Sequence, residues 1–172
     1  NLTSNVVRNG ADLDARNGII GDYRVGNFDN LVVHDVTVRN IYLRGIYASF
    51  GKTFNISHNT VDNVAGESQS IAIMNWSGHG LFEYNVVTNS NDGIGSNWST
   101  GTTYRYNEVI NSGAGIHTDN NSGTPDVIEN NYVHDGAAGS YGIFVFAPIV
   151  NGVTVRGNVI ENVDVGLSAA RQ

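Results

Sequence analysis

Four ring side chains stand at matching positions in the 172-residue chain and could act on a sugar. Each comes directly before the first residue of a repeated phrase, which predicts that they stack in one stripe: His34, His58, Tyr84 and Tyr106. Stacked rings could hold a sugar face, and a histidine could act as a general acid or base. The alternative interpretation is that these bulky residues only cover a bend of the backbone.

His117 is a further catalytic candidate, because it follows Gly115-Ile116 and is expected to point outward from a strand. Tyr47 holds the equivalent position in another copy of the phrase, so we take it as a candidate for substrate binding. Arg39, Arg44 and Lys52 form the one basic cluster of the sequence near the histidine stripe. These cations could meet a carboxylated sugar; the alternative is that they are solvated edge charges.

Oxygen-rich turns suggest a metal site. Asp119 and Asn121 resemble the start of a calcium-binding loop, although nothing in the sequence supplies the distant bidentate glutamate of such a loop. Asp92 lies in a second oxygen-rich turn, and Ca²⁺ bound at either turn would need ligands from neighbouring copies. The alternative is two polar turns, and no other cofactor is predicted.

Composition excludes several classes of protein. The net charge of −7 and the absence of cysteine exclude a basic nucleic-acid footprint, disulfides and thiolate metal sites. No stretch is apolar over the length that a membrane span requires. The composition is that of a single packed domain, residues 1–172, whose partners would be glycans or proteins.

These candidates are positioned by a phrase of the form Asn-x-aliphatic-x-Asn followed by Gly-Ile, which recurs seven times at intervals of 22 to 30 residues. Its apolar residues alternate with a period of two, so the units are strands and the chain is an all-β solenoid. The first residue of each copy is expected to lie inward at a bend and to form an amide ladder: Asn5, Asp35, Asn59, Asn85, Asn107, Asn131 and Asn158.

Equivalent residues of stacked coils should form columns. The predicted aliphatic column is Leu2, Val32, Ile56, Phe82, Tyr104, Ile128 and Val155, and the adjacent outward column alternates in charge as Glu83, Arg105, Glu129 and Arg156. Longer gaps between copies predict loops at one edge, which in solenoids often build the binding face: Gly10 to Asn17, Ala65 to Gln69 and Gly136 to Tyr141.

The repeated phrase resembles the repeat of the pectin-lyase-like superfamily. That resemblance implies a right-handed, single-stranded parallel β-helix of about seven coils. No capping element is apparent in the sequence, so we expect a segment of a longer chain, or copies that stack through open ends. Gly78-His79-Gly80 resembles an element of polygalacturonase-type hydrolases, but the Asp-Asp and Arg-x-Lys elements of those enzymes are missing.

The sequence therefore leaves three functions open. The first is an extracellular or cell-surface scaffold or fibre domain that contacts carbohydrate. The second is a polysaccharide lyase, glycoside hydrolase or uronate epimerase that acts on a groove along one face. The third is a carbohydrate-binding module that uses the ring stripe without chemistry. Missing catalytic sets favour the scaffold, and the ring stripe together with His117 favours the enzyme.

Overall fold

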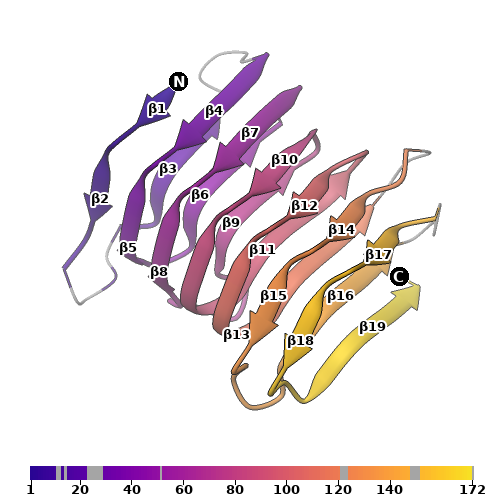
Figure 1. Cartoon of the computed structure of the whole chain (residues 1–172). Helices are drawn as coiled ribbons and strands as arrows, with labels where there is room; N and C mark the ends of the chain where they lie inside the picture. Colours follow the sequence, from indigo (N-terminus) through magenta and orange to yellow (C-terminus); the bar gives the residue numbers. More distant parts are fainter. Residues whose placement is uncertain are drawn as a thin grey trace.

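The computed structural model describes residues 1–10, 13, 15–22, 29–50, 52–120, 124–147 and 152–171. The described chain is all strand and turn, and it winds into a parallel β-solenoid of about six turns, with the two ends of the chain at opposite ends of the stack (Figure 1). This confirms the predicted fold class. Within the described residues, no helix is long and apolar enough to cross a membrane.

Each turn contributes strands to three columns, and neighbouring strands within a column are parallel. The first column is a seven-stranded sheet of β1 (Leu2–Thr3), β4 (Asn30–His34), β7 (Thr53–Ser57), β10 (His79–Glu83), β12 (Thr103–Arg105), β14 (Val127–Glu129) and β17 (Thr154–Arg156). The second column contains β2 (Val6–Arg8), β5 (Thr37–Ile41), β8 (Thr60–Val64), β11 (Val86–Ser99), β13 (Glu108–Asn120), β15 (Tyr132–His134) and β18 (Val159–Glu161).

The third column carries the candidate site. It contains β3 (Asn17–Asp22), β6 (Arg44–Ser49), β9 (Ile71–Trp76), the second halves of β11 and β13, β16 (Tyr141–Ala147) and β19 (Val165–Arg171). Two of the predicted loops, Ala65 to Gln69 and Gly136 to Tyr141, connect the second column to the third. The loop predicted at Gly10 to Asn17 lies partly outside the described residues.

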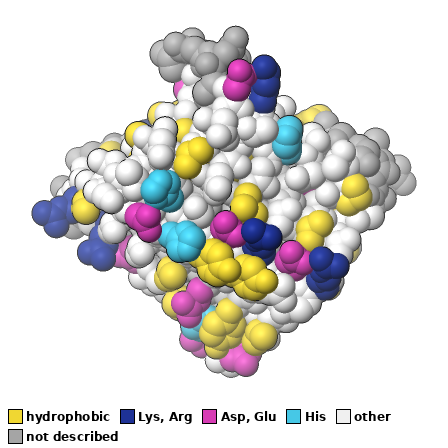
Figure 2. All heavy atoms as spheres, turned by 45° about the horizontal axis from the view of Figure 1, so that its top comes forward, with side chains coloured by type: hydrophobic (Ala, Val, Ile, Leu, Met, Phe, Trp, Pro, Cys, Tyr) yellow, Lys and Arg dark blue, Asp and Glu magenta, His cyan; other side chains and the backbone are white. Residues whose placement is uncertain are grey.

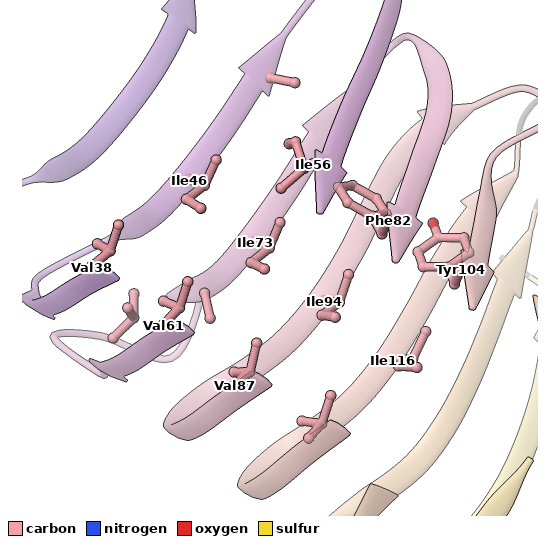
Figure 3. Close-up of a cluster of buried hydrophobic side chains, with 14 of the residues drawn as sticks. Val38, Ile46, Ile56, Val61, Ile73, Phe82, Val87, Ile94, Tyr104 and Ile116 are labelled. Carbon is pink, nitrogen blue, oxygen red and sulfur yellow. The ribbon is translucent and has the colours of Figure 1, made fainter. Parts of the chain in front are cut away.

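Apolar side chains from all three columns meet inside the solenoid (Figure 3). Because the strands are parallel and in register, each apolar residue packs on its equivalent one coil away, as in the series Ile46, Ile73, Ile94 and Ile116. The predicted aliphatic column is confirmed except at one position. Leu2 and Ile56 are in register with Val33, which is fully buried, whereas Val32 is in register with Asn55.

The inward asparagines form the expected ladder. The side-chain oxygen of Asn85 accepts from the backbone N–H and the side-chain amide of Asn59, and Asn107 does the same for Asn85. Each of these amides also donates to a backbone carbonyl of the first column. The ladder satisfies polar groups that the bend would otherwise leave buried without partners.

Asn5 and Asp35 were predicted as ladder members, and both predictions are wrong. Asn5 is exposed, and its amide donates to the Thr3 carbonyl. Val36 occupies the inward position, where its backbone N–H donates to the Asn59 side chain. Asp35 instead lies one residue earlier, exposed, at a φ of 55°. The strand register is the same on both sides of the bend, so this copy contains no inserted residue: Val36 is the equivalent of Asn59, and Asp35 is the equivalent of His58.

Charged side chains on the outward face of the first column pair across neighbouring strands. Arg105 donates to Glu83 over 2.8 Å, and Arg156 donates to Glu129 over 2.7 Å. Acidic and basic side chains lie side by side on this face of the molecule (Figure 2). The alternating charge column predicted from the sequence is therefore confirmed.

Candidate functional site

The outward face of the third column contains a groove of about 300 Å³. It crosses strands β6, β9, β11 and β13 and is bordered by the loop before β9. The lining residues are Arg44, Ser68, Gln69, Ile71, Met74, Trp76, Asp92, Asn97 and His117. Concave sites that combine apolar walls with a few convergent polar groups are the usual places for ligands.

His117 is held against the floor of the groove. In register, it lies beside Gly95 of β11, and the imidazole ring occupies the space that a side chain at Gly95 would fill. One ring nitrogen, Nε2, lies 3.3 Å from the Asn97 side-chain oxygen, and Nδ1 lies 3.7 Å from an oxygen of Asp92. His117 is only 8% exposed, so its orientation is fixed by packing rather than by solvent.

Burial sets the charge of this histidine. Desolvation lowers the pKa of His117 to about 4, and the positive charge of Arg44 acts in the same direction. The imidazole is therefore neutral at neutral pH. A neutral imidazole carries one N–H and one free acceptor, so its proton can serve either Asn97 or Asp92 but not both.

Two carboxylates flank the histidine. Burial raises the pKa of Asp92 to about 6, although Arg44 and a hydrogen bond from the Ala114 backbone oppose the shift. Burial also raises the pKa of Asp119 to about 6, and the nearby charge of Asp92 adds to it. Asp119 points to the same face as His117, because the two residues are two positions apart on β13 and side chains alternate between the two faces of a strand. Both acids are thus poised to exchange protons near neutral pH.

Arg44 supplies the positive charge of the groove. Its guanidinium donates to the backbone carbonyls of Leu43 and Gln69 and lies 5.9 Å above the Tyr47 ring. Among the described residues, no carboxylate lies within ion-pair distance of it, and burial lowers the pKa of Arg44. Its charge therefore acts on Asp92 and His117 across the groove rather than through a direct salt bridge.

Three of the four residues predicted for the ring stripe do stack on one another. His58 stacks on Tyr84 at 4.9 Å between ring centroids, and Tyr84 stacks on Tyr106 at 5.1 Å. His34 is not part of it: His34 is in register with Ser57, and its Nδ1 lies 2.8 Å from Asp35. The same alignment error explains this, because the equivalent of His58 is Asp35 and not His34. Because the three rings cover one another, most of their faces are not free to hold a sugar.

The stripe and the groove are separate regions. His58, Tyr84 and Tyr106 lie at the bend between the first and second columns, all with φ near 55°, whereas His117 lies in the third column. Of the predicted basic cluster, only Arg44 lines the groove. Arg39 lies on β5 of the second column, and Lys52, just before β7, is 2.7 Å from Asp29.

The predicted calcium ligands are partly described. Asp119 and Asp92 both lie near the groove, on neighbouring strands, while Asn121 lies outside the described residues. Within the part of the chain that the structure describes, no three His, Cys, Asp or Glu side chains gather closely enough to hold a metal ion. A calcium site therefore remains a prediction from the sequence.

Sequence reasoning missed two features of the groove. The first is the apolar wall formed by Met74 and Trp76 on β9. The second is the placement of Arg44 across from Asp92. The equivalence of Tyr47, His117 and Phe144 was confirmed by the strand register, so extending that alignment to Met74 and to Asp92 could have found both.

Comparison with known proteins gave no match to a family model, to a curated protein sequence or to a solved structure. The class of protein that the chain defines is therefore a parallel β-solenoid with a polar groove on one outward face.

Proposed function

We propose that this protein is a glycoside hydrolase that cleaves a neutral polysaccharide lying in the groove of the third column. The observation that carries the proposal is the row of Asp92, His117 and Asp119 on two neighbouring strands, with the His117 and Asp92 side chains 3.7 Å apart. Glycoside hydrolysis uses two carboxyl groups, one to protonate the leaving oxygen and one to activate water or attack the sugar. Two acids with pKa values of about 6 suit those roles.

The charge of the groove favours a neutral substrate. Its lining contains one cation, Arg44, and one carboxylate, Asp92, so the groove has no excess positive charge, and the whole chain carries a charge of −7. Elimination or epimerisation of a uronate needs a cation to neutralise the substrate carboxylate, and Arg44 already donates to two carbonyls. The repeat resembles that of the pectin-lyase-like superfamily, whose members include many polysaccharide-processing enzymes. A polysaccharide substrate would place the protein outside the cell or at its surface.

The test is incubation of the protein with a panel of neutral and uronate polysaccharides, with and without Ca²⁺. Reducing ends report hydrolysis, and absorbance of unsaturated products reports elimination. We expect reducing ends from a neutral polymer, and a loss of about 10²- to 10⁴-fold in rate for Asp92→Asn. Glu83→Gln is the matched control, because Glu83 is an outward carboxylate of the first column that already pairs with Arg105.

Two results would contradict the proposal. Unsaturated products would identify a lyase instead. No product from folded protein across the whole panel would favour the scaffold function, in which the groove binds a glycan or nothing at all.

A further inference from the structure

Trp98 follows Asn97, which lines the groove, and lies at a bend position where the two preceding coils have Phe50 and Ser77, also with a left-handed φ. Asn97 is in register with Asp119, and Ser99 is in register with Asn120, so Trp98 is an extra residue with no partner in β13. Its φ of 58° lies in the left-handed region, which a bulky side chain seldom adopts. A single extra residue in a strand is a β-bulge, and bulges beside active sites re-aim side chains.

The two neighbours of Trp98 fix the direction of the bulge. Ser99 is fully buried, and its hydroxyl donates to the buried Asp126 inside the solenoid. Asn97 faces the groove and contacts His117. Because one neighbour is held inside and the other outside, the indole of Trp98 is directed to the surface, where the residue is 49% exposed.

The aromatic surface of Trp98 continues the wall of the groove. Trp76 lines the groove, is in register with Asn97, and has its ring 6.1 Å from that of Phe50. One coil before Trp98 the equivalent position is Ser77, which also has a left-handed φ. A serine side chain is too small to cover an indole, so Trp98 differs from Tyr84 and Tyr106, which stack on each other.

We propose that Trp98, with Trp76 behind it, is a stacking platform for a pyranose ring of the polysaccharide, at the end of the groove next to Asp119. This inference rests on the proposed function for its choice of ligand. The hydroxyl groups of a sugar can bond the amides and carboxylates of the groove, while the C–H face of the ring packs on the indole. The platform would hold one sugar unit outside the row of Asp92, His117 and Asp119.

The chain offers a direct readout, because Trp76 and Trp98 are its two tryptophans. Intrinsic tryptophan fluorescence therefore reports on Trp76 in the groove wall and on Trp98 beside it, and the Trp98→Asn variant separates the two. The experiment titrates neutral β-linked gluco-, xylo- and manno-oligosaccharides of two to six units into Asp92→Asn protein, in which cleavage is slowed. We expect a saturable fluorescence change, and affinity that rises when the oligosaccharide becomes long enough to reach the platform.

The deciding variant is Trp98→Asn, because asparagine tolerates a left-handed φ and Trp98 makes little contact with the core. We expect binding, measured by calorimetry in the Asp92→Asn background, to weaken about two- to tenfold. The matched control is Tyr106→Asn, which removes an aromatic residue of similar exposure, 46%, and similar φ, 55°, from the ring stripe. This control should bind as the Asp92→Asn protein does.

The outcomes separate the two proposals. Equal affinity of the Trp98→Asn protein and the Tyr106→Asn control overturns the platform, even if the enzyme hydrolyses a polymer. Binding that depends on Trp98 without any hydrolysis by the unmodified protein supports the platform and overturns the hydrolase. No binding of any oligosaccharide overturns the platform as a sugar site.

Discussion

The outward faces of the first and third columns both carry charged side chains, but these side chains form ion pairs on the first column and are partly buried on the third. On the first column, Glu83 and Glu129 each meet an arginine of the next coil within 3 Å. On the third column, Asp92 and Asp119 are partly buried, their pKa values are raised, and Arg44 is bonded to backbone carbonyls. The first arrangement is stable by itself, whereas in the second no arginine or lysine among the described residues forms a direct ion pair with either aspartate.

The difference teaches how function can be recognised in a repeat fold. Every coil offers the same outward positions, so a coil that serves only the structure fills them with residues that satisfy their neighbours. Titratable residues whose pKa values are shifted by burial, and that lie together in a groove, are candidates for catalysis. The three variants below test this comparison, and the scale of their effects should differ.

The largest effect on stability is expected at the ladder that supports both faces. Asn107→Ala removes four hydrogen bonds, and the buried backbone N–H of Asn85 loses its acceptor. We expect a loss of about 3–5 kcal/mol in the free energy of unfolding, measured by urea denaturation. Asn30→Ala, an exposed residue outside the ladder, should change it by less than about 0.5 kcal/mol. Similar losses in the two variants would show that the ladder has no special role.

An intermediate effect of opposite sign is expected in the groove. The pKa of Asp92 is raised from 3.8 to about 6, so the folded state binds more protons than the unfolded state between about pH 4 and pH 6. Stability contributed by this group therefore falls as the pH rises through that window, and the full penalty is present above it. Asp92→Asn removes the charge and should stabilise the fold by about 1–2 kcal/mol at pH 7.5.

The check for Asp92→Asn is a series of thermal or urea denaturations from pH 3.5 to pH 8. The difference from the unmodified protein should shrink towards zero near pH 4, where Asp92 itself is protonated. A variant that is less stable at pH 7.5 would mean that the Asp92 charge is structural. The contrast between the two faces would then disappear.

The smallest effect is expected on the first column. Glu83→Gln breaks the pair with Arg105, but both side chains have access to solvent. We expect a loss of about 0.2–1 kcal/mol that decreases at high salt, since exposed ion pairs contribute little and are screened. A double-mutant cycle with Arg105→Gln measures the coupling of the pair. Coupling well above 1 kcal/mol would show that this face also depends on its charges.

The fold was predictable from the sequence because the same strand pattern recurs in every copy of the repeat. Seven copies with a period of two establish parallel strands, and their alignment placed the Glu83–Arg105 pair and the Asn59–Asn85 ladder correctly. The errors at Val32 and Asp35 have one cause. Val36 stands where the other copies have asparagine, so the sequence alignment started this copy one residue too early, at Asp35. A shift of one residue reverses which side chains face inward.

The groove was less predictable. His117 and Asp119 were found by alternation along one strand, but the depth of the groove depends on Gly95, which makes room for the imidazole ring. Trp98 lies at the surface because it occupies the left-handed bend position that Phe50 and Ser77 hold in the two preceding coils, and that equivalence is set by the register between strands. Neither is visible in the pattern of a single copy, because both arise from contacts between coils.

The ladder gives the solenoid an electrical direction. The side-chain amides of Asn59, Asn85, Asn107 and Asn131 each donate to the next asparagine towards the C-terminal end, so their dipoles point the same way, as the peptide dipoles of a helix do. Bonds in such a chain polarise one another, and each is stronger for having neighbours on both sides. Val36 has no side-chain amide, so the series of bonded amides stops at Asn59 and does not continue to Asn5. The aligned amide dipoles thus extend over the five coils from Asn59 to Asn158, with the positive end towards the last coil.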